Sequence, residues 1–178
     1  MPSFSPSDPT LRLAQTFTPL VAGILDGISV SLSESGTPLP SSVTVALYDT
    51  NLGQPSNELA TATILAPALT STPTLFTADF SSQNINLNTS DLYAIVLSPS
   101  PSGPYSWRGD NPGSYDGGNY FFSNNSGINW NDSFMDEDRG FRVTVIPEPT
   151  SALLLLLSTL GIAIRQRSQT TTAPPKRR

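Results

Sequence analysis

The chain has 178 residues and a formal net charge of −5 at pH 7, and it contains neither cysteine nor histidine. The absence of these residues excludes disulfides, thiol chemistry, a histidine-dependent serine triad and the commonest transition-metal ligand. Residues 1–148 carry four arginines against all fourteen acids, a balance of −10, so no basic patch is available to neutralise nucleic-acid phosphates. We therefore expect no nucleic-acid partner.

Residues 1–12 contain neither a basic segment nor an apolar run, so they do not read as a secretory signal peptide. We expect them to be a disordered N-terminus. The C-terminal tail described below requires export, so we also expect the natural translation start to lie further upstream. The alternative is a decayed gene copy whose product is never exported.

Residues 13–146 show the alternation of apolar and polar side chains that is typical of half-buried antiparallel strands. The first strand is expected at 14–17, and 92–97 is apolar enough to be a central strand buried on both faces. Turn residues separate the strands at 36–40, 51–55, 98–104 and 110–113. The pattern predicts an all-β domain, an antiparallel jelly-roll-like sandwich, with no helix before residue 150. The apolar residues expected to share one face of a strand are Ile28, Val30 and Leu32; Val43, Val45 and Leu47; Phe76, Ala78 and Phe80; and Phe141, Val143 and Val145.

Seven aromatic residues lie between 105 and 130 among many Asn, Ser and Gly residues. Aromatic rings stack on the apolar faces of sugars while polar side chains bond their hydroxyls, so Tyr105, Trp107 and Trp130 are candidate glycan contacts. The competing interpretation is that these rings fill the core of the domain.

The acids Asp132, Asp136, Glu137 and Asp138 form an oxygen-rich cluster that could coordinate calcium, but their spacing matches no EF-hand or calcium repeat. Their simpler interpretation is a solvated loop, and we expect no metal and no cofactor. Two carboxylates could serve a glycoside hydrolase, but any chain with fourteen acids offers such pairs by chance. We expect no enzymatic activity.

The C-terminal tail begins at Pro147, Glu148 and Pro149 and continues into an uncharged apolar run. Prolines suit the start of a helix rather than its interior, so a helix is expected at 150–164. Its fifteen residues would span about 22 Å, less than the roughly 30 Å hydrocarbon core of a bilayer. Its leucines and isoleucines still favour insertion by about 2 to 5 kcal/mol. The residues expected in the membrane are Leu153, Leu154, Leu155, Leu156, Leu157, Leu160, Gly161, Ile162 and Ile164.

The basic residues Arg165 and Arg167 follow the apolar run, and residues 168–178 end in Lys176, Arg177 and Arg178. Positive charge is retained on the cytoplasmic side of a membrane, so the C-terminus is expected in the cytoplasm and the β domain outside. Residues 168–178 are expected to be a disordered basic tail. The alternative for the apolar run is a buried core helix, but a core helix would have polar positions at helical spacing.

The tail at 147–167 resembles the PEP-CTERM sorting signal of bacterial surface and exopolysaccharide-associated proteins. The resemblance rests on Val145 to Pro149, the leucine-rich run containing Gly161, and Arg165 to Arg167. It implies that the helix holds the protein in the inner membrane until an exosortase recognises Pro147, Glu148 and Pro149 and removes it. The extension at 168–178 departs from the family, whose members usually end soon after the basic cluster.

The β domain resembles the choice-of-anchor R domain, a bacterial surface domain found with alternative C-terminal anchors. The order of several short motifs carries this resemblance: 14–17, 43–49 with 53–55, 92–97, 105–107 and 141–145. It implies no ligand and no activity. We expect an exported, non-enzymatic surface or matrix protein whose partners are an exosortase, the inner membrane and extracellular polysaccharide. The alternatives are a carbohydrate-binding module and a carboxylate-based glycoside hydrolase.

Overall fold

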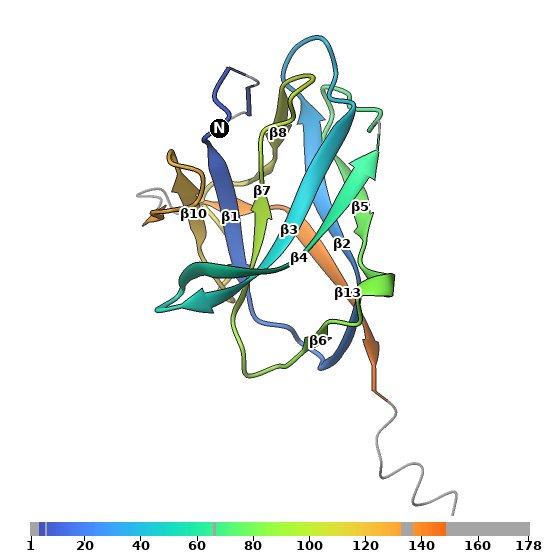
Figure 1. Ribbon diagram of the computed structural model, residues 1–178, viewed down its shortest axis with the longest axis vertical. Coiled ribbons are helices and arrows are strands. Elements are labelled where there is room, and N and C mark those ends of the chain that lie inside the picture. The colour runs from blue at the N-terminus through green and yellow to red at the C-terminus, as the bar shows by residue number, and fades with distance from the viewer. Residues whose placement is uncertain (1–3, 6, 66, 133–136, 149–178) are drawn as a thin grey trace, which may run out of the picture. The chain divides into compact units, whose positions relative to one another are not determined.

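The computed structural model describes residues 4–5, 7–65, 67–132 and 137–148 (Figure 1). The chain divides into two units, Met1–Pro147 and Glu148–Arg178, and of the second unit only Glu148 is described. Strands account for 53% of the structure and helix for 2%, and the paired strands are antiparallel. The all-β expectation is therefore confirmed. The expected helix at 150–164 lies outside the described residues.

The larger sheet has six strands in the order β11-β10-β1-β7-β3-β4. Every residue of β7 is buried, because the strand is flanked by β1 and β3 and is covered on both faces. This confirms the expected central strand and explains why its sequence is apolar without alternation. The bounds are β1 (Arg12–Phe17), β3 (Ser42–Asn51), β4 (Gln54–Leu65), β7 (Tyr93–Leu97), β10 (Tyr120–Ser123) and β11 (Asn131–Asp132).

The second sheet is built around β2 (Gly23–Glu34), which pairs with four other strands. The order is β13-β2-β5, and the short strands β6 and β8 also pair with β2. Two further short strands pair with each other, β9 (Gly109–Asp110) with β12 (Asp138–Arg139). The remaining bounds are β5 (Thr74–Asp79), β6 (Asn86–Leu87), β8 (Tyr105–Trp107), β13 (Phe141–Pro147) and the single-turn 3₁₀ helix η1 (Ser81–Gln83).

Side chains from both sheets meet in one hydrophobic cluster, which includes Leu13 and Leu47 from the first sheet and Ile28 and Leu32 from the second. Each fully buried aliphatic side chain of this kind contributes roughly 1.5 to 3 kcal/mol to folding. A smaller cluster of Ala14, Ala46, Ala94, Val96 and Phe121 occupies the six-stranded sheet. Four of these residues are directly paired across the strands: Ala46 with Val96, Val96 with Ala14, and Ala14 with Phe121.

All twelve residues that the alternating patterns placed on one face of a strand are buried or half-buried. The expected faces of β2 and β3 are fully buried, and those of β5 and β13 are buried or half-buried. The expected loop at 51–55 is wrong in extent, because β3 continues to Asn51 and β4 begins at Gln54. Only Leu52 and Gly53 form the turn, and both have positive φ angles. Pro55 is tolerated in β4 because β4 lies at the edge of its sheet.

Candidate functional site

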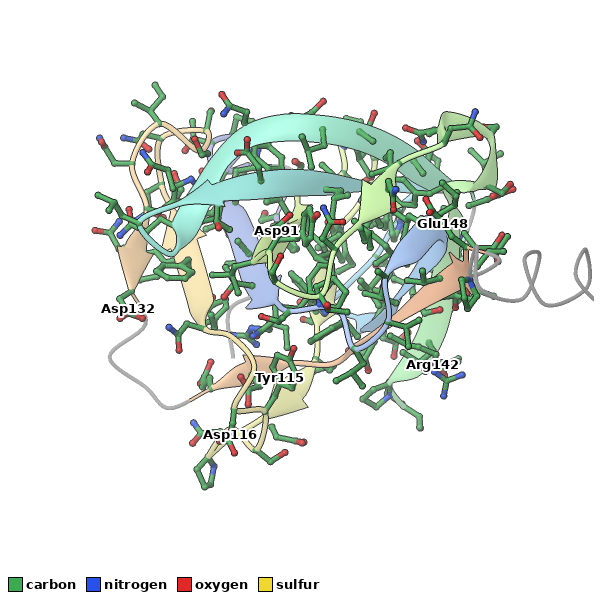
Figure 2. All side chains as sticks on the ribbon, turned by 90° about the horizontal axis from the view of Figure 1, so that it is seen from below. Asp91, Tyr115, Asp116, Asp132, Arg142 and Glu148 are labelled. Atoms are coloured by element: carbon green, nitrogen blue, oxygen red, sulfur yellow. The ribbon has the colours of Figure 1, made fainter. Side chains whose placement is uncertain are left out.

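The C-terminal end of β13 is where the described domain reaches the expected sorting motif. Residues 141–145 alternate apolar and polar side chains, and 141–146 are rich in β-branched types, which favours a strand with one face on the core. β13 pairs only with β2 among the described strands, so its other edge is unpaired. The strand ends at Pro147, which pairs with Gly23 and is exposed. Figure 2 shows Glu148 just beyond this end, also exposed.

Gly23 permits β2 to approach the end of β13 closely. Its φ angle of 149° lies in a region that side chains rarely adopt, and a Cβ atom there would lie 2.2 Å from the carbonyl oxygen of Ile146. One residue of β2, Asp26, is left over where the register shifts between Thr144 and Val145. Such a bulge increases the local twist and redirects the strand. The path of the chain into Pro147 is thus set by Gly23 and by the bulge.

The loop that joins β1 to β2, residues 18–22, lies at the same lower end of the domain as the end of β13 (Figure 1). It contains Leu20, which is 97% exposed, and Val21, which is 50% exposed. On β13, Ile146 is 54% exposed. We call Leu20, Val21, Ile146 and Pro147 the apolar tip. Sequence reasoning missed the loop, although a run of Pro, Leu, Val and Ala without a charge was a signal for an apolar surface.

An open groove of about 450 Å³ runs between the 18–21 loop and the core-facing side of β13. Its lining includes Phe17, Leu20, Tyr115, Val143 and Val145. Tyr115 closes one side, because its ring packs edge-on against Phe141, with 5.3 Å between the centroids. Its hydroxyl oxygen also accepts a 3.3 Å hydrogen bond from the backbone amide of Thr18. Burial raises the pKa of Tyr115 above its ordinary value.

The apolar tip and the residues next to it carry almost no charge. The segments 17–25 and 143–148 together contain a single ionisable side chain, that of Glu148. Docking this end of the domain against an apolar phase would therefore remove few charges from water. The chemistry available here is hydrophobic contact rather than catalysis.

Two of the three candidate glycan contacts are buried in the core, so the expectation is wrong for Tyr105 and Trp107. Trp107 has no exposed surface, and its indole Nε1 donates a 3.0 Å hydrogen bond to the carbonyl of Gly140. Tyr105 is equally buried, stacks on Phe4 and donates its hydroxyl to the carbonyl of Ser98. Burial raises the pKa of Tyr105 well above its usual value. Both rings belong to β8, whose pairing with β2 places them in the hydrophobic cluster.

Trp130 is half-buried and packs against the small cluster on the six-stranded sheet. Trp130 is thus the one ring of the three candidate glycan contacts that is partly exposed. A sugar site normally needs a platform together with convergent polar groups, and the trio does not form one.

The acidic cluster forms structural interactions within the domain. Glu137 accepts a 2.7 Å hydrogen bond from Nη2 of Arg139 and one from Asn111, and Asp138 accepts a 2.6 Å bond from the amide of Tyr115. These carboxylate oxygens already have partners, which lowers their availability to a metal or a substrate. Among residues 4–5, 7–65, 67–132 and 137–148, no group of three or more acids could hold a metal ion. Asp136 lies outside the described residues.

The remaining candidate residues of the tail also lie outside the described residues, namely Pro149, the apolar segment at 150–164, Arg165 and Arg167. In the part of the chain that the structure does describe, no helix has the length and apolar character needed to cross a bilayer.

Comparisons with known proteins provide no relative for this chain. No protein-family model matches it, and neither does any curated protein or solved structure.

Proposed function

We propose that this chain is an exported, non-enzymatic surface or extracellular-matrix protein. In this proposal the segment 150–164 holds it in the inner membrane, and an exosortase removes that segment after recognising Pro147, Glu148 and Pro149. In this proposal the two sheets pack as a jelly-roll-like sandwich of the choice-of-anchor R type, an architecture that would suit a passive exported domain. Its destination is the cell surface or the extracellular polysaccharide.

The observation that carries the proposal is the order of features after the last strand. A Pro-Glu-Pro tripeptide, an uncharged leucine-rich run and a basic end follow one another without an intervening domain. Each feature has a separate physical role: restricted backbone at the motif, insertion into lipid, and retention of the C-terminus in the cytoplasm.

The exposure of Pro147 and Glu148 supports access by a processing enzyme. Both lie at the surface, and the strand that leads to them has an unpaired edge. A substrate segment must leave its own domain to enter an active site, and a motif that begins where the sheet ends can do so without unfolding the core.

The two alternatives have less support. A carbohydrate-binding module would depend on Trp130 alone from the expected trio, because Tyr105 and Trp107 are inaccessible to ligand. A glycoside hydrolase needs two carboxylates facing one sugar in a cleft, whereas Glu137 and Asp138 accept hydrogen bonds from Arg139 and Tyr115. The passive cargo role requires neither feature.

Mass spectrometry of the processed chain tests the proposal. The chain is fused behind a heterologous signal peptide and expressed with and without an exosortase. We expect a product that lacks the apolar segment only when the enzyme is present. Replacing the charge with an amide in Glu148→Gln should slow this processing, whereas Glu58→Gln, an exposed acid in β4, should leave it unchanged. A chain that keeps its tail in the presence of the enzyme, or equal processing of both variants, would contradict the assigned role of the motif.

A further inference from the structure

We propose that the apolar tip, formed by Leu20, Val21, Ile146 and Pro147, docks into the interface of the phospholipid bilayer while the protein is membrane-held. The inference rests on the proposed function, since it requires insertion of the segment 150–164. It adds a second membrane contact, made by the folded domain itself, to the one made by the tail.

The apolar side chains of the tip are unusually exposed. Leu20 is almost fully accessible, and Val21 and Ile146 are each about half accessible. Single exposed apolar residues are common on protein surfaces, but here they come from two segments that converge on the pairing of Gly23 with Pro147. The groove behind the loop extends the apolar character inward along Val143 and Val145.

The chain between the tip and the expected membrane segment is short. Only residues 148 and 149 separate Pro147 from the start of the segment at 150. Even a fully extended chain covers about 11 Å over this interval, at the maximal advance of about 3.6 Å per residue. When the segment is inserted, Pro147 is therefore held close to the lipid headgroups. Bringing the tip to lipid then costs little translational entropy, so a small apolar contact is sufficient.

The charged side chains of the domain are unevenly distributed. Within the described ranges the acids of the domain lie elsewhere than in the loop 18–22 and the last residues of β13, apart from Glu148. Residues 1–148 carry a balance of −10, which an anionic membrane repels over a Debye length of about 8 to 10 Å. The favourable orientation puts the uncharged tip in the interface and the acids in water. Moving exposed leucine and valine side chains into that position lowers the free energy, as it does for interfacial helices.

Site-specific fluorescence tests the docking, and the chain suits it because it has no cysteine. Leu20→Cys is labelled with an environment-sensitive dye in the full chain, reconstituted into phosphatidylethanolamine and phosphatidylglycerol vesicles. Leu52→Cys is the matched control, because Leu52 is also 97% exposed but lies in the turn between β3 and β4. Vesicle flotation after alkaline extraction shows independently whether the tail is inserted.

We expect the emission of the Leu20 probe to shift to shorter wavelength and to be quenched by lipid-attached quenchers, with little change at position 52. Adding Val21→Asp to Leu20→Cys should reverse the shift without releasing the chain from the vesicles. The shift should persist in high salt, because the contact is apolar.

Three results would overturn the inference. If the chain floats with the vesicles but the Leu20 probe stays in an aqueous environment, docking is wrong and the proposed function survives. If the shift depends on the protein-to-lipid ratio and lipid quenchers do not reach the probe, the tip contacts a second copy instead. If the chain does not float, both the inference and the proposed membrane segment are wrong.

Discussion

Arg139 is a guanidinium group inside the domain, with 2% of its surface exposed. It lies 4.0 Å from the centre of the Tyr120 ring, donates Nη1 to the carbonyl of Trp107 and forms a 2.7 Å ion pair with Glu137. Its backbone amide donates to Oε1 of Gln15. Through these contacts one residue of β12 connects β8, β1 and β10. A buried charge of this kind is stabilising only while its partners remain in place.

Removing the carboxylate that pairs with Arg139 should therefore be costly. We expect Glu137→Ala to lower the free energy of unfolding by about 3 to 5 kcal/mol, because it leaves a buried cation without its counter-ion. Urea unfolding of the full chain in mild detergent measures the change. Glu58→Ala is the comparison, since Glu58 accepts an exposed hydrogen bond from Tyr48. This substitution should lower the free energy of unfolding by less than about 0.5 kcal/mol. Equal losses in the two variants would show that the ion pair does not stabilise the domain.

For single residues, the local sequence pattern is a poor guide to which side chains are exposed to solvent. Tyr105 and Trp107 occur in a polar, glycine-rich stretch that is typical of an exposed loop, and yet they are core residues. Their burial follows from the pairing of β8 with β2, which lies more than seventy residues earlier in the chain. Conversely, the exposure of Leu20 depends on how the loop 18–22 is held over β13. The pairing of β8 with β2 has no local signal, whereas the uncharged run at 18–22 was a local signal for the apolar surface around Leu20.

Strands with one buried face were predictable, whereas the edge strand β4 was not. The segments 28–32 of β2 and 43–47 of β3 place an apolar side chain at every second position, and those positions are fully buried. β4 is equally long, but most of its residues are exposed and it contains glutamate, asparagine and proline. Pairing with β3 holds it in the sheet. The first half of β4, residues 54–59, therefore lacks the alternation that identified β2 and β3, and only 60–64 show it.

The end of β13 gives a prediction at the level of the strand. Gly23→Ala adds a Cβ atom that would meet the carbonyl of Ile146 and also strains a φ angle of 149°. We expect a loss of about 1 to 3 kcal/mol and faster hydrogen exchange in the peptide covering 141–148. Gly53→Ala also strains a positive φ angle, of 83°, but the added atom has no neighbour within 4 Å. Exchange in 141–148 should stay unchanged in that control. Unchanged exchange in Gly23→Ala would refute the role given to Gly23.

At the level of the whole molecule, titration should confine maximal stability to a window between acid and strongly alkaline pH. Burial raises the pKa of Tyr105, Tyr120 and Tyr115 in the folded state. Hydrogen bonds from Ser81 lower the pKa of Asp79, and those from Asn88 and Ser90 lower the pKa of Asp91. A raised pKa stabilises the fold below the unfolded value, and a lowered pKa stabilises it above that value.

We therefore expect the free energy of unfolding to fall as pH rises above about 10, where unfolded tyrosines lose their protons first. It should also fall as pH drops below about 4, where the folded aspartates still resist protonation. Urea unfolding across the pH range measures both limbs. Tyr105→Phe should flatten the alkaline limb, at a cost of about 0.5 to 1.5 kcal/mol near neutral pH from the lost bond to Ser98. Tyr48→Phe, at a half-buried position, should flatten it less. An alkaline limb that Tyr105→Phe leaves unaltered would exclude Tyr105 as its source.

The pairing of β13 with β2 also sets the order in which the fold can be completed. β2 is among the first strands to be synthesised, but its partner is the last, ending at Pro147. This edge of β2 therefore cannot pair with β13 until nearly the whole domain has been synthesised. Closing so long a loop is slow. The leucine-rich run is synthesised directly after β13, so under the proposed function the polypeptide would stay threadable for export until its tail is made.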